Sequence, residues 1–399
     1  MKRIYSLLFI VWIANAVDAQ NNFDKWFSDN TLRMDYEIWG TRTKAEAKFE
    51  SFTVSNRWGG ERFAVSDCPK YGGYYMQLTD YVTDSVIYTY SYSSLFEEWQ
   101  MMDSADFFHK PFREAVIMPM PKQKSVVTIY KGVNEENFEK LFTKEFDPKT
   151  EDIKQAPKFP VTPINTPIGD NGNLGIAILS YGYNKKQKQD FINEAKMAAN
   201  WLLESEPYSE FKDRLEINAV FVENNNAPRG DINAHLSFYF NTFGIERYLA
   251  SLDIPSVYNC AQSTAFRHVI VLVNSKVYGG SGFYNFYACV TSRNKSSEEV
   301  LLHEFGHSFA GLGDEYEGGV TYDTTEINKQ NKYPNLATAD KIEEKWGKIN
   351  AVEGGGYCTK GVFRPYEHCR MHALNDHFYC PCCKKIVRET IIKQTERQK

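Results

Sequence analysis

The chain has 399 residues, a formal net charge of −5 and an aromatic content of 15%. This length favours two domains over one, and the aromatic content is ample for large hydrophobic cores. The mild acidity gives no reason to expect nucleic acid or an anionic surface as a partner, and no segment beyond the N-terminal leader is long and apolar enough to cross a membrane. We expect a monomer.

Residues 1–19 have the pattern of a secretory signal peptide. Basic residues precede an apolar run that begins at Ile4, and Val17-Asp18-Ala19 is a small-residue cleavage site. The apolar run is too short to serve as a stable membrane anchor. We therefore expect export to the periplasm, the cell surface or the extracellular space.

Residues 20–147 have a β-rich pattern, for which we expect a β-sandwich-like domain. Alternating, β-branched or aromatic residues between turn signals predict strands at 49–54, 73–81, 85–92 and 125–131. This part contains no paired histidines and no cluster of metal ligands, so we expect it to position substrates. Its many tyrosines either cover half-buried strands or form a face that binds sugar or protein.

Residues 148–168 combine proline with charged residues and have no apolar period, which predicts an extended, stiff linker. Residues 169–399 then have an α/β pattern. We expect strands at 174–180, 215–222, 268–274 and 283–291 and helices at 186–204, 338–346 and 384–394. The run Tyr278-Gly279-Gly280-Ser281-Gly282 predicts a turn into the strand at 283–291, which we expect to border the substrate cleft as an exposed edge.

The segment that follows contains His303-Glu304-Phe305-Gly306-His307, a His-Glu-x-x-His motif. Ser296 and Glu299 have the spacing of a capping box, which predicts the start of a helix. On this helix the two histidines lie on one face, about 6 Å apart along the axis, opposite the apolar residues. Both imidazoles can then bind one Zn²⁺ while Glu304 reaches the attacking water. The alternative is a pair of exposed histidines on a solvated face.

A third ligand is expected from the turn after the helix. Gly311 provides a helix stop, and the reversed chain can bring Asp314 to the metal. Metzincins place this ligand about ten residues after the first histidine, and here Asp314 comes one residue later. Glu315 is adjacent and could substitute. Glu326 is a rival of the thermolysin kind, but the residues before it are poor helix material.

These residues, Asp314-Glu315-Tyr316 included, resemble the IgA-peptidase family of bacterial zinc metallopeptidases. The resemblance covers most of the chain and extends to Leu32-Arg33-Met34-Asp35-Tyr36, Glu97-Glu98-Trp99-Gln100, Tyr278-Gly279-Gly280-Ser281-Gly282 and Cys369-Arg370-Met371. It implies an N-terminal family domain, and it implies host glycoproteins such as immunoglobulin A as substrates. The order of strands and helices is also that of metzincin-like catalytic domains, so we expect an α+β protein with a metzincin-like zinc peptidase domain.

The predicted chemistry is peptide hydrolysis, with Glu304 as general base. The metal would hold the oxyanion with help from Tyr316 or another nearby donor, although a tyrosine after such a turn is more often a packed aromatic. Met371 follows Cys369 in the pattern of a methionine turn and would form the floor beneath the metal. The alternatives are a glycan- or protein-binding surface protein with an inactive protease fold, and a different zinc hydrolase such as an amidase.

Cysteines in an exported protein predict disulfides. The eight cysteines lie at positions 68, 260, 289, 358, 369, 380, 382 and 383. The cluster Cys380-Pro381-Cys382-Cys383, with Cys358 and Cys369, could instead be a structural zinc knot, but the oxidising compartment favours disulfide bridges.

Overall fold

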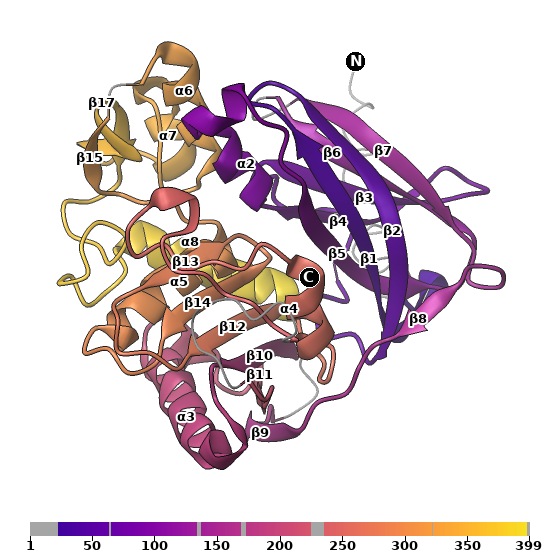
Figure 1. Ribbon diagram of the computed structural model, residues 1–399. Helices are drawn as coiled ribbons and strands as arrows, with labels where there is room; N and C mark the ends of the chain where they lie inside the picture. Colours follow the sequence, from indigo (N-terminus) through magenta and orange to yellow (C-terminus); the bar gives the residue numbers. More distant parts are fainter. Residues whose placement is uncertain are drawn as a thin grey trace, which may run out of the picture.

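The computed structural model describes residues 23–63, 65–133, 137–168, 173–224, 235–320 and 322–396 (Figure 1). The expected signal peptide at residues 1–19 lies outside these residues. The described chain is a mixed α+β protein. Within it, we find no helix that is both long and apolar enough to span a membrane.

Two four-stranded sheets form the N-terminal part, with strand orders β5-β1-β2-β8 and β4-β3-β6-β7. Aromatic side chains fill the space between them. The ring of Tyr36 on β1 lies 5.6 Å from that of Phe142 on β7, and Phe52 on β2 lies 4.8 Å from Phe146. The strands are β1 (Phe27–Gly40), β2 (Ala45–Asn56), β3 (Tyr74–Asp80), β4 (Val86–Tyr92), β5 (Phe112–Pro121), β6 (Ser125–Gly132), β7 (Phe138–Phe146) and β8 (Ile153–Gln155).

A six-stranded sheet of order β13-β14-β12-β10-β11-β9 forms the centre of the C-terminal part. Four inner strands are parallel, and the two outer strands, β9 and β13, are antiparallel to their neighbours. The strands are β9 (Val161–Asn165), β10 (Leu174–Tyr181), β11 (Leu215–Val220), β12 (His268–Val273), β13 (Gly280–Phe283) and β14 (Tyr287–Thr291).

The expected edge strand at residues 283–291 is corrected by this topology. Its core, β14, is an interior strand between β12 and β13. The glycine-rich residues that were interpreted as a turn form the outer strand β13, whose Gly280 forms a further bridge to Tyr248. The sequence predicts a turn here because glycine is rare in strands. The strand forms nevertheless, because glycine is tolerated where another backbone approaches closely.

Both faces of the six-stranded sheet are buried, which explains the nearly continuous apolar runs of its strands. On β10, Ile176 and Ile178 face one core, whereas Ala177 and Leu179 face the other. Helices α3 (Lys188–Glu204), α5 (Ser297–Ala310) and α8 (Pro381–Thr395) cover the first face. The second face packs against α4 (Ile254–Ala261) and the N-terminal sheets, so one core spans both parts of the chain (Figure 1).

Polar contacts also join the two parts. Arg267 at the start of β12 donates from Nε to Oε2 of Glu61 over 2.9 Å, and both side chains are largely buried. The expected linker at residues 148–168 is extended, but it contributes β8 to an N-terminal sheet and β9 to the six-stranded sheet. The division of the chain into separate domains at these residues stays a prediction.

The remaining elements lie around the end of α5. A small sheet of order β15-β17-β16 contains β15 (Glu317–Val320), β16 (Val352–Gly355) and β17 (Tyr357–Arg364). Short helices are α2 (Leu95–Gln100), α6 (Thr324–Lys329) and α7 (Ile342–Trp346). The predicted helices at 186–204, 338–346 and 384–394 correspond to α3, α7 and α8.

The expected disulfides are not formed, since all eight cysteines lie among the described residues and all are free thiols. Cys260 on α4 and Cys289 on β14 are single buried side chains of the shared core, where a thiol packs as a small apolar group. Two thiols donate to backbone carbonyls: Cys289 to Leu249 over 2.9 Å and Cys358 to Lys360 over 2.9 Å. The signal-peptide pattern led to the expectation of disulfides, but it does not show which cysteines the fold brings together.

Candidate metal centre

Helix α5 carries the His-Glu-x-x-His motif, and its two ends are set by local sequence. The predicted capping box is wrong: Ser296 makes no side-chain cap, and its N–H donates to Asn294 Oδ1 over 3.0 Å. Glu299 instead binds Arg370 over 3.2 Å. At the other end Gly311 adopts φ 66°, the left-handed conformation expected of a glycine stop, and its N–H donates to the His307 carbonyl.

The outer strand β13 lies directly on the functional face of α5, and this explains its glycines. A Cβ on Gly282 would lie 2.1 Å from the Glu304 carbonyl oxygen, so only glycine allows this approach. A Cβ on Gly280 would lie 3.1 Å from Glu304 Cγ. The side chain of Glu304 is thus held between the helix and the outer strand, and it is half-buried.

The structure brings His303, His307 and Asp314 together as three potential metal ligands. His303 Nε2 lies 3.0 Å from Asp314 Oδ1 and 3.1 Å from His307 Nε2. His307 Nε2 lies 3.2 Å from Asp314 Oδ1. Zinc bonds of about 2.0–2.1 Å at tetrahedral angles separate ligand atoms by about 3.3 Å. The three atoms therefore fit one zinc ion and leave room for a fourth ligand.

The tautomers of both histidines are set by backbone carbonyls. His303 Nδ1 faces the Arg370 carbonyl at 2.9 Å, and His307 Nδ1 faces the Leu312 carbonyl at 2.5 Å. Because a carbonyl only accepts, each Nδ1 must donate, and each neutral imidazole then has its lone pair on Nε2. Both lone pairs are directed to the position that the metal would occupy, which is the usual orientation of zinc-binding histidines.

Charges at the centre shift three pKa values. Burial raises the pKa of Asp314, but His307 and the hydrogen bonds from both histidines outweigh it and hold this pKa far below its usual range. Burial lowers the pKa of His307, but Asp314 outweighs it and raises that pKa to about 9. Burial raises the pKa of Glu304, an effect that the two histidines partly offset. A raised pKa brings a carboxylate closer to the value that suits a general base at neutral pH.

The second oxygen of Asp314 is held by a tyrosine that the sequence did not indicate. The Tyr357 hydroxyl donates to Asp314 Oδ2 over 2.6 Å. The Tyr316 hydroxyl in turn donates to the Tyr357 hydroxyl over 3.0 Å. Tyr316, the expected oxyanion donor, thus lies close to Asp314 and contacts Tyr357. No motif surrounds Tyr357, which enters from the first residue of β17 after a run of glycines.

The rival third ligands lie elsewhere. Glu315 is adjacent to Asp314, but its side chain lies beside Cys383 instead. Glu326 does lie on a helix, α6, contrary to the sequence expectation. Asp323 accepts from the Glu326 N–H while the Glu326 side chain accepts from the Asp323 N–H, and this capping box stabilises a helix that propensity alone disfavours. Neither carboxylate joins the two histidines.

Met371, the expected floor beneath the metal, packs against the helix that carries the histidines. It is fully buried, and its Sδ would lie 3.0 Å from a Cβ placed on Gly306. Its carbonyl accepts from the Glu315 N–H over 2.8 Å, next to the Arg370 carbonyl that orients His303. The segment therefore supports both the helix and the Asp314 turn.

The N-terminal part also borders the centre, through α2. Burial and the neighbouring Glu97 raise the pKa of Glu98 to about 7, with further influence from Lys332, Asp314 and His307. Lys332 forms a 3.0 Å ion pair with Glu97. The Glu97-Glu98-Trp99-Gln100 motif thus lies near the candidate ligands, which the sequence alone did not indicate.

The site defines a class of protein. A His-Glu-x-x-His helix that converges with one further carboxylate is the arrangement of metal-dependent hydrolases. Comparison with known families agrees: the model described as IgA Peptidase M64 matches residues 166–350, and the model described as Peptidase M64 N-terminus matches residues 22–143. The chain belongs to the IgA peptidase M64 family and is a peptidase. No curated protein matches the chain.

Proposed function

We propose that the protein is an exported zinc endopeptidase in which His303, His307 and Asp314 hold the metal. One observation carries this proposal: three acceptor atoms lie 3.0–3.2 Å apart while both Nδ1 atoms are committed to backbone carbonyls. Converging lone pairs and a carboxylate at this spacing suit a cation bound between them. A donor set of two imidazoles and one carboxylate is one that zinc hydrolases use.

Zinc at these residues would supply Lewis-acid activation of a water and of the scissile carbonyl. Glu304, on the same face of α5, takes the proton of the attacking water and then delivers it to the leaving amine. Its position between α5 and Gly280 restricts its rotamers. Tyr357 and Tyr316 position Asp314 rather than contact the reacting atoms. Met371 is the floor that keeps the helix in place, as the methionine turn does in metzincins.

The proposed substrates are host glycoproteins such as immunoglobulin A. The name of the matched family supports this class of substrate, and the signal-peptide pattern supports a location outside the cytoplasm.

The proposal is tested by incubating wild type and Glu304→Gln with a protein panel that includes immunoglobulin A and mapping new termini by mass spectrometry. Glu304→Gln should keep its zinc and lose about 10²–10⁴-fold in rate. His307→Ala should lose the zinc of this centre. Glu298→Gln, an exposed carboxylate on the same helix, is the matched control and should stay near wild-type activity.

A cleavage rate of Glu304→Gln within a few fold of the wild-type rate would refute the mechanism. Capture of glycan or protein without cleavage would instead support the binding-protein alternative. Cleavage confined to amides outside peptides would support the alternative of a zinc amidase.

A further inference from the structure

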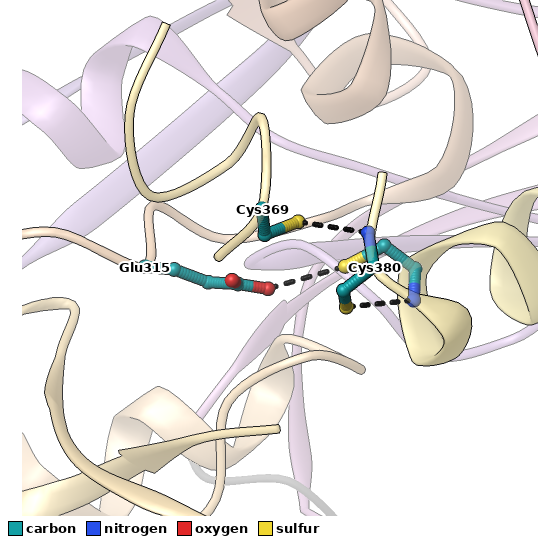
Figure 2. Close-up of side chains that lie close together, drawn as sticks. Glu315, Cys369 and Cys380 are labelled. Atoms are coloured by element: carbon teal, nitrogen blue, oxygen red, sulfur yellow. Dashed lines mark hydrogen bonds between the residues drawn. The ribbon is translucent and has the colours of Figure 1, made fainter. Parts of the chain in front are cut away.

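A second group of metal-ligand side chains lies next to the first and has no part in the proposed chemistry. It consists of Glu315, Cys369, Cys380 and Cys383, whose ligand atoms all lie within 4.8 Å of one another. All four residues have no solvent exposure. Figure 2 shows Glu315, Cys369 and Cys380 converging from three segments: the turn after α5, the loop before Met371 and the N-terminus of α8, whose first turn carries Cys383.

The carboxylate of Glu315 is the feature that apolar packing does not explain. Its Oε1 accepts from Asn335 Nδ2 over 2.9 Å and faces Cys383 Sγ at 3.1 Å. Its Oε2 is buried and has no hydrogen-bond partner. No lysine, arginine or histidine of the described chain forms an ion pair with it. A buried carboxylate in this position is costly unless a cation lies beside it.

We propose that Glu315, Cys369, Cys380 and Cys383 bind a structural Zn²⁺. The group offers four ligand atoms, the number that closed structural zinc sites use, and three of them are thiolates, the donors that favour zinc. Zinc–sulfur bonds of about 2.3 Å would separate the sulfur atoms by about 3.8 Å, which agrees with the observed clustering. The unpartnered Oε2 is then explained, since the carboxylate binds the ion.

The backbone around the cluster is arranged for thiolates. The Cys380 N–H donates to Cys369 Sγ over 3.3 Å, and the Cys383 N–H donates to Cys380 Sγ over 3.5 Å. Cys380 is the N-cap of α8 and Cys383 lies in its first turn, where the helix dipole stabilises negative charge. Pro381 at the first helical position fixes this turn. Cys382, between them, is half-buried and outside the group.

Outer contacts also hold the carboxylate. Asn335, fully buried, accepts from the Gly313 N–H over 2.6 Å and donates to the Gly313 carbonyl over 2.9 Å while it donates to Glu315. Such contacts to a ligand are typical of metal sites, since they fix the orientation of the donor atom.

A disulfide explains the cluster less well. A disulfide between any two of the three cysteines would leave the buried carboxylate of Glu315 with one thiol beside it and no positive charge to compensate it. Zinc uses all four side chains at once. It would also join the segments that carry Asp314 and the Arg370 carbonyl, because Glu315 follows the first and Cys369 precedes the second.

The test is the zinc content of the purified full-length chain, measured by mass spectrometry of the elements. Wild type should hold two zinc ions per chain, His307→Ala one, and Cys382→Ser, the matched control outside the cluster, two. Cobalt-substituted His307→Ala should show thiolate-to-cobalt charge-transfer absorption, which Cys380→Ser in the same background should abolish. None of these readouts depends on activity.

Two results would overturn the proposal: no zinc in His307→Ala, or a disulfide between two of the three cysteines in non-reducing peptide maps of the wild type. If Cys380→Ser does not fold, the zinc content of His307→Ala and the peptide maps of the wild type still test the structural zinc site. The outcome also separates the two centres. One zinc per wild-type chain that persists in His307→Ala supports the structural site and contradicts the catalytic one.

Discussion

The Tyr357 hydroxyl donates to Asp314 Oδ2 over 2.6 Å, so that Oδ1 alone is directed at His303 and His307. Tyr357 achieves this with φ 67°, a left-handed conformation that costs a non-glycine residue about 1–3 kcal/mol. Strain of this kind persists where surrounding contacts enforce it. Here it brings a donor to the carboxylate that would complete the metal centre.

Tyr357→Phe should therefore weaken zinc binding at this centre about 10–100-fold, the usual cost of removing a donor that orients a metal ligand. Competition with a chelator measures the affinity. Tyr316→Phe leaves the hydrogen bond from Tyr357 to Asp314 in place and should cost less. An equal loss in both variants would contradict the assigned order of contacts.

Gly282→Ala should disrupt the centre by separating β13 from α5. The new Cβ would lie 2.1 Å from the Glu304 carbonyl oxygen, which is backbone and has little freedom to move. We expect a lowered Tm and reduced zinc content. Gly244→Ala is the control: its Cβ meets nothing within 4 Å, so it brings only the strain of its positive φ. A Tm change in Gly282→Ala no larger than in the control would show that the strand can shift.

The buried ion pair between Glu61 and Arg267 should stabilise the joint between the two parts of the chain. Glu61→Gln leaves the Arg267 charge uncompensated and should reduce the free energy of unfolding by about 3–5 kcal/mol. Denaturant unfolding measures this. Asp106→Asn at the exposed Arg42–Asp106 pair should leave the free energy of unfolding nearly unchanged. Similar losses of unfolding free energy in both variants would mean that burial of the ion pair does not decide how much it stabilises the protein.

The core shared by the two parts of the chain predicts that a chain starting near Ile164 does not fold by itself. Removal of the N-terminal sheets would expose apolar residues such as Val257, Phe266 and Phe286. We expect this truncated chain to be insoluble or unfolded by circular dichroism. A soluble, zinc-binding product would show that the C-terminal part is an independent domain.

His268 should make the protein less stable in acid. Burial, with a contribution from Arg267, lowers its pKa from 6.5 to about 3. Below pH 6.5 the unfolded state binds a proton that the folded state does not, so stability falls by about 1.4 kcal/mol per pH unit until about pH 3. His268→Gln should remove this slope and leave stability above pH 7 less affected. If the free energy of unfolding of both proteins changed with pH in parallel, His268 would not be the source of the slope.

The sequence determined the features that depend on local geometry. The spacing of His303 and His307 places them on one face of any helix, and Gly311 is where such a helix stops. Asp314 follows so closely that the reversed chain reaches the two histidines with little freedom. Several strands, such as β3 and β6, were also predicted, because alternation of apolar residues is a local signal.

Other elements of the fold were missed where the local signal pointed elsewhere. Strands β1, β5 and β7 were not predicted. The glycines of β13 resemble a turn unless the helix against which they pack is known, and the helix at Glu326 depends on a reciprocal cap that propensity does not reveal. In each case the deciding contact outweighs the intrinsic preference of the residues.

Only the tertiary structure decided which distant residues share a site. Tyr357 reaches Asp314, α2 of the N-terminal part borders the centre, and three of the eight cysteines gather at Glu315 rather than pair as disulfides. The physical reason is common to all three. A periodic pattern shows that a side chain is buried, but its partner is chosen by the packing of whole sheets and helices, which brings together residues that no sequence spacing relates.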